Sequence, residues 1–266
     1  MFSGFRGLLF VGVICCASCA APLVKLPSGP GAPAPDAADA FNEATSACRA
    51  VSTLSAEVGV SGSVGGRRLR GSLLVGVAPP ASARIEALAP AGQPIFIFVA
   101  TGDEATLLLP RDNRVLPRGS PAAVLEAVAG PPLDAVQLRE TLTGCASATG
   151  AIQGRQMGDD WRVVPQGSTD LYLHRVAGRW QLVAAVHRNS DSSTWRAEYS
   201  AFESGSPRAL RLASADGKRF DLRLQLSQVE TNAQLGPDVF RVQIPRDADP
   251  ITLDELKRSG PLGAAK

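Results

Sequence analysis

The stretch from Ser82 to Leu116, SARIEALAPAGQPIFIFVATGDEATLLLPRDNRVL, predicts three antiparallel strands and the start of a fourth. Residues 82–88 alternate between the two faces, which is the period of a half-buried strand. The next run, Pro94–Val99, is apolar on both faces. One face of such a strand must meet a core, and the other needs a second cover. Turns separate the strands at Ala89–Gly92, Thr101–Glu104 and Pro110–Asn113.

Two interpretations fit the large side chains of the apolar run, which are Ile95, Phe96, Ile97 and Phe98. In the first, they divide between the core of an ordinary β-sandwich and contacts with covering helices. In the second, one face of the strand lines a hydrophobic cavity. The pattern alone does not separate a filled core from a hollow pocket.

The composition is that of a globular protein, with 45% hydrophobic and 20% charged residues among 266. A chain of this length can bury the core of one sizeable domain or of two small ones. Lys and Arg number 27, and Asp and Glu 25, which gives a formal net charge of +2. Because no basic arm or stripe accompanies this balance, we expect no nucleic-acid partner.

Residues 1–18 have the features of a secretory signal peptide, since one positive charge, Arg6, precedes a short apolar segment. This segment is too short to remain as a membrane-spanning helix. It ends in CASC at positions 16–19, which resembles the bacterial lipobox, although Cys stands at the first position, where Leu is usual. We therefore expect Cys19 to be diacylated and to form the mature N-terminus. Cleavage by ordinary signal peptidase near Ala20 is the alternative.

Residues 20–39 are rich in Pro, Ala and Gly and lack a periodic apolar face. This composition predicts an extended, disordered tether. At about 3.1 Å per residue in polyproline geometry, the tether would let the domain stand up to about 60 Å from a membrane. The predicted organisation is a signal peptide (1–18), a lipidated cysteine with its tether (19–39) and a single domain (40–266).

Strands flank the central stretch on both sides. Leu54–Val60 and Arg68–Val77 alternate around a glycine-rich turn and predict a hairpin. After residue 159 the strand pattern returns at Trp161–Pro165, Asp170–Arg175, Arg179–Arg188, Thr194–Phe202, Ala209–Ala213, Arg219–Val229 and Phe240–Ile244. The predicted inward faces of two of these strands are Trp180, Leu182, Ala184 and Val186, and Phe220, Leu222, Leu224 and Leu226. About eleven strands exceed what a flat open sheet usually carries, so we predict a strongly curved antiparallel sheet that forms an incomplete β-barrel.

Two short helices interrupt the strands. The first, Ser120–Ala129, has Pro at its first helical position and ends at Gly130, and the second runs over Leu133–Leu142. Their apolar stripes are Val124, Leu125 and Val128 in the first helix, and Leu138 and Leu142 in the second. Helices inserted between strands of an antiparallel sheet fit a lid better than a crossover, so the predicted class is mainly β with a helical lid (α+β). Further short helices are predicted at Asp39–Ala50 and Ile251–Arg258.

The mature domain contains none of the common motifs of catalytic or metal sites. It has no Gly-x-Ser-x-Gly, His-Glu-x-x-His or redox Cys-x-x-Cys motif. Its two histidines, His174 and His187, lie in strand patterns next to arginines, and we expect both to be solvated. The sequence predicts neither an enzyme nor a bound metal or cofactor.

Two cysteines, Cys48 and Cys145, follow Cys19. Exported proteins commonly form disulfides, so we expect these two to pair. The bond would close a span of 97 residues (145 − 48) and, in the chain-entropy model, stabilise the fold by roughly 4–5 kcal/mol. Two buried free thiols are the alternative, because the sequence does not show that the residues are adjacent.

Several short motifs, taken in order, resemble the LolA/LolB superfamily of periplasmic lipoprotein carriers, and the lipid-anchored LolB branch best. They are the strand and Pro-x-Gly loop of Arg84–Gly92, the Gly-x-Pro-Leu step at Gly130–Leu133, and the strands Arg196–Phe202 and Leu210–Leu226. The resemblance covers about residues 54–229. It implies an incomplete barrel, apolar on its concave side, in which a helical lid covers bound acyl chains.

Two departures from the family are visible. The loop formed by Pro90, Ala91 and Gly92 would face the membrane or the cargo, but it carries Ala91 where the lipid-anchored acceptors have a bulky apolar residue. The tail after Glu230 runs beyond the usual LolB end. Ala20, rather than Asp, follows the lipobox cysteine, which implies residence in the outer membrane.

We therefore expect a lipid-anchored outer-membrane protein facing the periplasm. It would hold acyl chains of lipoproteins or other lipids and exchange them with a periplasmic carrier protein. The expected cavity residues are Ile85, Ile95, Phe96, Ile97, Phe98, Leu107, Trp180, Leu182, Phe220, Leu222 and Leu224. The alternatives are a lipid-anchored structural or assembly module of the cell envelope, whose sheet is filled by its helices, and, third, an enzyme.

Overall fold

A computed structural model describes residues 22–89, 92–148 and 150–259 of the chain. The strands in this part are β1 (Ala32–Pro33), β2 (Leu54–Val64), β3 (Arg67–Ala78), β4 (Ser82–Leu88), β5 (Pro94–Thr101), β6 (Glu104–Leu109), β7 (Arg114–Gly119), β8 (Arg155–Gln156), β9 (Trp161–Gln166), β10 (Thr169–Val176), β11 (Arg179–Arg188), β12 (Thr194–Glu203), β13 (Ser206–Ser214), β14 (Phe220–Thr231) and β15 (Asp249–Pro250). The α-helices are α1 (Ala37–Thr45), α2 (Pro121–Ala129), α3 (Ala135–Thr143) and α4 (Leu253–Ser259), and the short 3-10 helices are η1 (Cys48–Ala50), η2 (Pro110–Asp112) and η3 (Pro237–Phe240).

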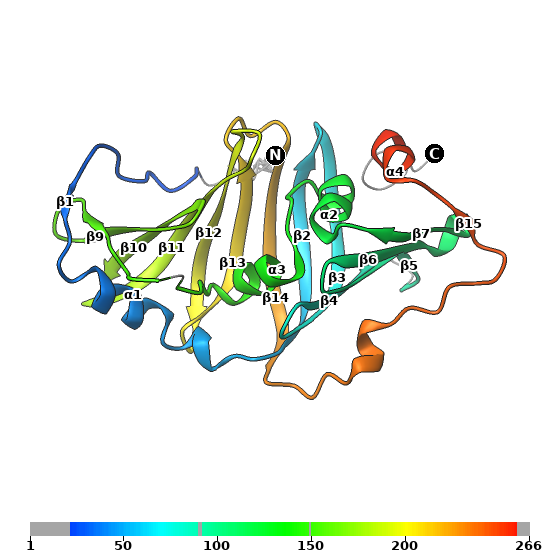
Figure 1. The fold of residues 1–266 in the computed structure, drawn as a ribbon, viewed down its shortest axis with the longest axis horizontal. Coiled ribbons are helices and arrows are strands. Elements are labelled where there is room, and N and C mark those ends of the chain that lie inside the picture. Colours follow the sequence, from blue (N-terminus) through cyan, green and yellow to red (C-terminus); the bar gives the residue numbers. More distant parts are fainter. Residues whose placement is uncertain (1–21, 90–91, 149, 260–266) are drawn as a thin grey trace, which may run out of the picture.

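All of these strands belong to one sheet, in the order β1-β8-β9-β10-β11-β12-β13-β14-β2-β3-β4-β5-β6-β7-β15. Neighbouring strands are antiparallel except β15, which lies parallel to β7. The sheet is strongly curved, and α2 and α3 lie across its concave side (Figure 1). Its two outermost strands are not joined to each other by hydrogen bonds, so the predicted incomplete barrel is confirmed. Three of the fifteen strands are only two residues long. The remaining twelve strands are longer, and this number is close to the eleven that the sequence predicts.

Both predicted lid helices are present; α2 has the predicted ends, whereas α3 begins two residues and ends one residue later than predicted. At the start of α3, the Asp134 carboxylate accepts a hydrogen bond of 2.7 Å from the Gln137 N–H, and the Gln137 side chain accepts one of 3.1 Å from the Asp134 N–H. This capping box satisfies two donors that the first turn of a helix leaves unpaired. Gly144, in the left-handed conformation at φ 64°, ends the helix.

Both faces of strand β5 are covered by other parts of the chain, as its apolar sequence requires. Phe96 and Phe98 are buried in the main core on the concave side. Ile97 faces the opposite side, where it packs beside Val99 and Phe240. The second cover is therefore the tail after β14, including the 3-10 helix η3, and not an α-helix.

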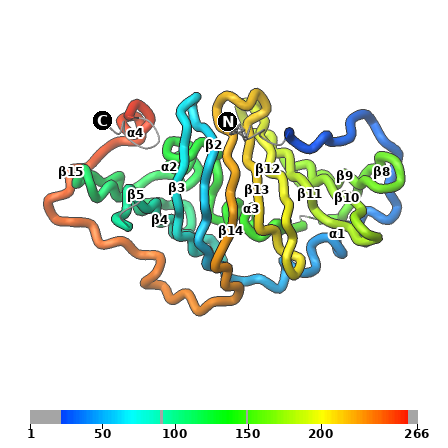
Figure 2. Tube along the Cα trace, turned by 180° about the vertical axis from the view of Figure 1, so that it is seen from behind, coloured from blue at the N-terminus to red at the C-terminus, as the bar shows by residue number. Residues whose placement is uncertain are grey.

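The tail runs from β14 past β4 and β5 to β15 and α4 (Figure 2). The strand predicted at Phe240–Ile244 is wrong, because this segment consists of the end of η3 followed by extended chain outside the sheet. Arg84 of β4 holds it in place, since its guanidinium donates to the carbonyl oxygens of Val239 at 3.0 Å and Arg241 at 2.8 Å. Beyond β15, Leu256 of α4 is buried in the main core, and α4 packs on α2.

The segment before α1 contacts the sheet, whereas the sequence predicted a free tether. The Val24 N–H donates to Glu198 Oε1 at 2.8 Å, and β1 pairs with β8. Asp36 accepts two hydrogen bonds from the Arg162 guanidinium, at 2.7 and 2.9 Å. Helix α1 starts at Ala37, before the predicted domain boundary at residue 40. Any free tether after Cys19 is thus much shorter than predicted.

A bulge in β11 changes which of its side chains face inward. Tyr172 pairs with Ala184, and Leu173 pairs with Leu182, so Val183 is the extra residue. Such a bulge reverses the alternation beyond it. The main core accordingly contains Ala185, whereas Ala184 and Val186, which were predicted to face inward, are not part of it.

The same bulge turns His187 toward the protein interior. Its ring stacks on Trp195 with the centroids 4.0 Å apart, and Nδ1 lies 3.0 Å from Thr169 Oγ1. Nε2 is buried without a hydrogen-bond partner among the described residues. Burial lowers the pKa of His187 from 6.5 to about 4, so the expected solvated histidine is wrong at this position. His174 is half-buried against Trp161.

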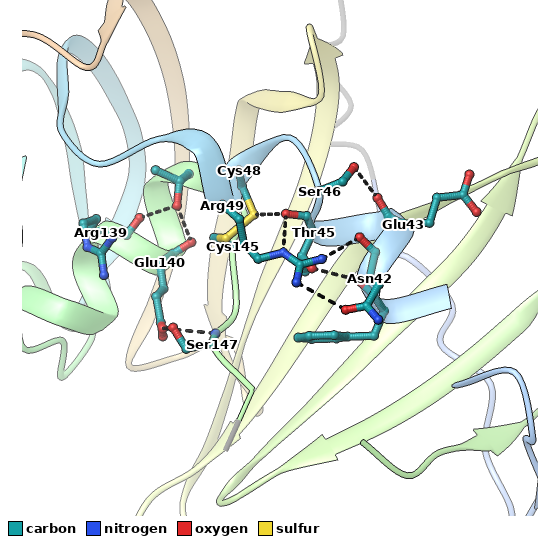
Figure 3. Close-up of a disulfide and its surroundings, with 12 residues drawn as sticks. Asn42, Glu43, Thr45, Ser46, Cys48, Arg49, Arg139, Glu140, Cys145 and Ser147 are labelled. Atoms are coloured by element: carbon teal, nitrogen blue, oxygen red, sulfur yellow. Dashed lines mark hydrogen bonds between the residues drawn. A yellow bond between two sulfur atoms is a disulfide. The ribbon is translucent and has the colours of Figure 1, made fainter. Parts of the chain in front are cut away.

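A disulfide joins Cys48 and Cys145, as predicted, with their Cα atoms 5.4 Å apart (Figure 3). It links η1 to the residue that follows the C-cap of α3. Hydrogen bonds stabilise the chain on both sides of the disulfide. Arg49 Nε donates to the Thr45 carbonyl at 3.4 Å, and Glu140 accepts 2.6 Å from the Ser147 hydroxyl. One end of α3 is therefore covalently fixed to the N-terminal helical segment.

Replacing both cysteines by serine should lower the free energy of unfolding by roughly 4 kcal/mol, because the bond closes a span of 97 residues in the unfolded chain. Chemical denaturation of the oxidised protein and of the Cys48→Ser/Cys145→Ser variant measures the difference. Thiol titration of the denatured, unreduced protein is the direct check. Two reactive thiols from this pair would contradict the bond.

His187, which is half-buried with its Nε2 atom inaccessible to solvent, predicts a pH dependence of stability. Its pKa is lower in the folded state than in the unfolded chain, so the unfolded state takes up a proton first as the pH falls. Stability should therefore decrease from about pH 6.5 to pH 4, by up to about 3 kcal/mol. In His187→Gln this contribution should disappear, which urea denaturation at several pH values would show. The matched variant His174→Gln should keep the wild-type slope, and an unchanged slope in His187→Gln would contradict the assignment.

Candidate functional site

An apolar cavity of about 110 Å³ lies between the lid and the concave face of the sheet. Its lining from the sheet includes Val60, Leu69, Leu73, Ile85, Ala87, Phe96, Leu212, Leu222 and Leu224. The lid side contributes Leu125, Val128, Ala129, Pro131, Leu133 and Leu138. The only charged side chain at the cavity is that of Arg70, at one end of the lining. The site therefore offers hydrocarbon contacts and almost no hydrogen bonds.

The cavity adjoins an open groove of about 1020 Å³, and the two share Val60, Arg70, Gly71, Ser72, Leu88 and Ile95. The strand register explains this opening. Strand β3 pairs with β4 only from Ser72 onward, so its residues 67–71 have no partner in β4. The gap between this part of β3 and the β4–β5 hairpin forms a lateral mouth for the cavity.

The structure brings together eight of the predicted cavity and lid residues. These are Ile85, Ile95, Phe96, Leu222 and Leu224 from the sheet, and Leu125, Val128 and Leu138 from the lid. Five more, namely Phe98, Leu107, Trp180, Leu182 and Phe220, are buried in the same core but do not line this cavity, and the lid residues Val124 and Leu142 are buried likewise. Ile97 lies on the opposite face of β5, so it cannot belong to a concave-side cavity.

Several lining residues were missing from the predicted site. Val60, Leu69 and Leu73 belong to inward faces that the alternation of the β2–β3 hairpin already indicates. Leu133 is the last residue of the Gly-x-Pro-Leu step, which the sequence does show. The predicted membrane loop borders the groove through Gly92, whereas Pro90 and Ala91 lie outside the described residues, as does Cys19.

The cavity is small with α2 and α3 packed on the sheet as they are in this structure. Ligand pockets usually measure about 300–1,000 Å³, so 110 Å³ holds only part of an acyl chain. Leu133 and Leu138 occupy much of the remaining space under the lid, since both are buried in the main core. A larger ligand has to displace these side chains, and with them part of the lid.

The two lid helices are restrained differently. The disulfide fixes α3 at its C-terminal end, while the step between α2 and α3 rests on Phe220 through Gly130. A Cβ atom on Gly130 would lie 2.9 Å from the Phe220 Cβ, and the glycine has φ 96°, which other residues rarely adopt. Only α3 therefore has a covalent restraint, whereas α2 and the step are held by packing against α4, β6 and Phe220.

A second, more polar chamber of about 400 Å³ lies on the other side of α3. Helix α3 lines it with Gln137, Glu140 and Thr141, and the sheet lines it with His187 and other residues of β10–β12. Tyr199 faces the same chamber, and burial raises the pKa of its phenol above the usual range. Helix α3 thus divides the concave side into an apolar and a polar compartment.

The described residues hold no group of three or more His, Cys, Asp or Glu side chains placed to bind a metal ion. The described helices also include none with the length and apolar character needed to cross a membrane.

The fold has counterparts among solved structures, although no protein-family model and no curated protein matches the chain. A LolA superfamily protein from Nitrosomonas europaea superposes with a TM-score of 0.54, at 10% sequence identity, over 77% of this chain and 97% of that one. A DUF1329 family protein from Desulfovibrio piger superposes with a TM-score of 0.51, at 12% identity, over 78% and 98%. At such low identity the likeness concerns the fold. The chain therefore has a LolA-like fold, an open β-barrel with a helical lid.

Proposed function

We propose that this protein is a lipid-anchored carrier of the periplasm that holds acyl chains of lipoproteins or other lipids under its lid. The observation that carries the proposal is the apolar cavity that opens into a lateral groove. Burial of an acyl chain there would contribute up to about 0.8 kcal/mol for each CH₂ group. With almost no polar partner in the lining, the chemistry of the site selects hydrocarbon over polar ligands.

The likeness to a LolA superfamily protein supports this proposal at the level of the fold. The LolB-like role, receipt of lipoproteins at the outer membrane, rests on the sequence motifs and on the lipobox. We propose a periplasmic carrier protein as the partner in exchange.

One observation favours a second candidate, a non-catalytic envelope module with a filled core. Most of the predicted cavity residues pack against one another, and the cavity measures about 110 Å³. A lid that never opens would leave it too small for an acyl chain. The two candidates therefore differ in whether the protein takes up lipid at all.

Lipid uptake is tested with a fluorescent fatty-acyl probe and the delipidated wild-type protein. We expect saturable binding, lowered at least tenfold in Phe96→Asp, because an unpaired carboxylate in this apolar lining is costly. Ala129→Phe is a second variant without a charge, and it should weaken binding because the ring fills the cavity under the lid. Arg223→Asp, on the outer face of β14, is the matched control and should bind as the wild type does. Wild-type protein without saturable binding would favour the filled-core module.

The lipid anchor is tested separately at Cys19. We expect processing that is blocked by globomycin and a mature protein in the outer-membrane fraction. Cys19→Ser should abolish both, because no thiol is then available for acylation. Cys15→Ser is the control and should be processed normally. An unacylated mature N-terminus by mass spectrometry would exclude the anchor.

A further inference from the structure

One end of the sheet carries a cluster of cationic side chains, which we call the basic end. It consists of Arg67, Arg68 and Arg70 at the β2–β3 hairpin and Lys218 and Arg219 in the β13–β14 turn. The two turns adjoin, since Val64 pairs with Phe220 and the Gly65 N–H donates to the Arg219 carbonyl at 2.8 Å. Arg67, Arg68, Arg70 and Lys218 are exposed.

Four of these five cations have no acidic partner in the part of the chain that the structure describes. Among the described residues, none of Arg67, Arg68, Arg70 and Lys218 forms an ion pair. The carboxylates of the adjoining turns are those of Asp216 and Asp191; both accept hydrogen bonds within their own turns, and Asp191 also interacts electrostatically with Arg219. Asp216 accepts from the Ser214 hydroxyl and the Lys218 N–H, and Asp191 accepts from Ser193. Five cations against two carboxylates leave a net charge of +3 at this end of a nearly neutral chain.

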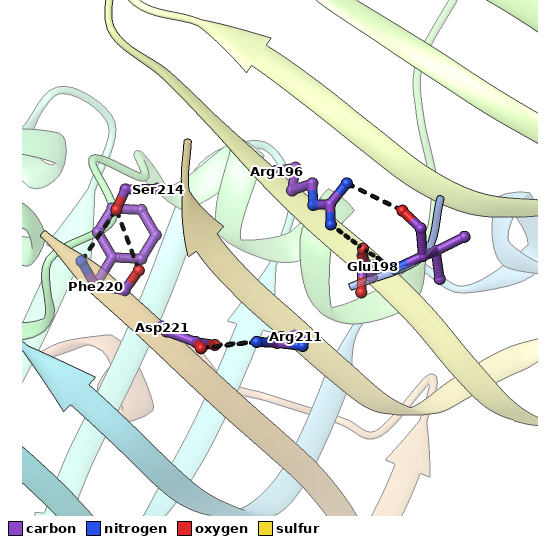
Figure 4. Close-up of polar contacts among 7 residues, drawn as sticks. Arg196, Glu198, Arg211, Ser214, Phe220 and Asp221 are labelled. Atoms are coloured by element: carbon purple, nitrogen blue, oxygen red, sulfur yellow. Dashed lines mark hydrogen bonds and ion pairs between the residues drawn. The ribbon is translucent and has the colours of Figure 1, made fainter. Parts of the chain in front are cut away.

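The N-terminal segment reaches the same end of the sheet. Val24 lies against the outer face of β12, where Glu198 accepts from its N–H and Arg196 Nη1 donates 3.2 Å to its carbonyl (Figure 4). In β12, Trp195 pairs with Ser214, which adjoins the β13–β14 turn. Cys19 is five residues before Val24, so an extended chain of about 3.4 Å per residue spans at most about 17 Å between them. A lipid on Cys19 would keep the basic end close to a membrane surface.

The mouth of the cavity lies beside the same cluster. Arg70 lines both the groove and the apolar cavity, and it stands three residues from the start of β3 at the hairpin turn. A bilayer against the basic end would thus face the opening through which an acyl chain enters. The chain could then pass from bilayer to cavity with little exposure to water.

We propose that the basic end is a docking surface for an anionic membrane, which holds the mouth of the cavity toward the lipid headgroups. This inference extends the proposed carrier function to the source of its ligand. Each Lys or Arg near an anionic surface strengthens membrane attraction, and the effect fades beyond a Debye length. Electrostatic docking would orient the domain, while the lipid anchor would supply the lasting attachment.

The test uses the unlipidated mature chain, residues 20–266, which retains every core residue from Ala34 to Leu256. Its sedimentation is measured with phosphatidylcholine vesicles and with vesicles of phosphatidylcholine and phosphatidylglycerol at 3:1. At 50 mM NaCl we expect at least tenfold stronger binding to the anionic vesicles, and this preference should disappear at 500 mM NaCl. Equal binding to both vesicle types, or no binding to either, would overturn the proposal.

Charge reversal locates the surface. Arg67→Glu/Arg68→Glu should lower binding to anionic vesicles at least tenfold, and the matched Arg175→Glu/Arg179→Glu, at the β10–β11 turn at the other end, should lower it less than threefold. The same loss in both variants would show a general effect of net charge and overturn the assignment. Both variants should bind the fluorescent acyl probe in solution as the wild type does, so a failure of docking is distinguishable from a failure of acyl binding.

Orientation is measured without changing any charge of the basic end. A bimane label on Ala215→Cys, in the β13–β14 turn, should be quenched by brominated lipid in anionic vesicles, while the same label on Asp103→Cys, in the turn between β5 and β6, should not. Equal quenching at the two positions would exclude docking through the basic end.

Discussion

Strand β5 needs a cover on each of its faces, and the rest of the fold depends on how these two covers are supplied. Phe96 and Phe98 on one face and Ile97 on the other would each expose a large apolar area without one. The concave side is covered by the lid helices, which the chain inserts directly after β7. The outer side is covered by the tail, which returns past β4 and β5 only after β14 is complete. The two covers come from segments that are separated in the sequence by strands β8 to β14, so the sheet can be sealed only when most of the chain has folded.

The two covers differ in how firmly they are held. The tail is tied down by the Arg84 guanidinium, which bonds two of its carbonyl groups, and by η3, whose Phe240 side chain is buried. The lid contacts the sheet through short apolar stripes and leaves a cavity beneath it. Atoms that line a cavity lack partners on one side, so the lid loses packing energy that the tail retains. The lid nevertheless buries more apolar side chains than the tail, in which Phe240 is the one residue buried in the outer cluster, so the cavity marks incomplete packing under an otherwise well-packed lid.

The alternation of apolar and polar residues was enough to predict the strands of the curved sheet. The Ser, Pro and Gly residues at the helix ends were enough to predict both lid helices. Local patterns failed where a distant segment or a single inserted residue decided the outcome. The extra residue Val183 reversed the inward face of β11, and this brought His187 inside. Ile97 was assigned to the cavity because an apolar run does not show which face is concave. The segment before α1 has the composition of a tether, yet Asp36 pairs with Arg162, which lies 126 residues away.

The same limits explain how much of the site the sequence could predict. Residues such as Phe96, Leu222 and Leu224 were identified because they alternate on inward faces. The residues that were buried but did not line the cavity, such as Phe98 and Phe220, alternate in the same way. Whether such a residue packs or lines a space depends on where α2 and α3 rest, and their position depends on the tertiary contacts of Gly130 and Cys145.

The position of α3 also limits what the concave side can hold. The helix separates an apolar compartment from one that includes His187, Glu140 and Tyr199. The disulfide at its C-terminal end prevents α3 from leaving as a whole, so the partition persists when α2 moves. An acyl chain that entered from the lateral mouth would have to pass the Glu140 carboxylate to continue beyond α3, and taking a charged group out of water is unfavourable. The apolar compartment therefore ends at α3, and a longer chain gains room only by lifting α2 and the step that joins it to α3.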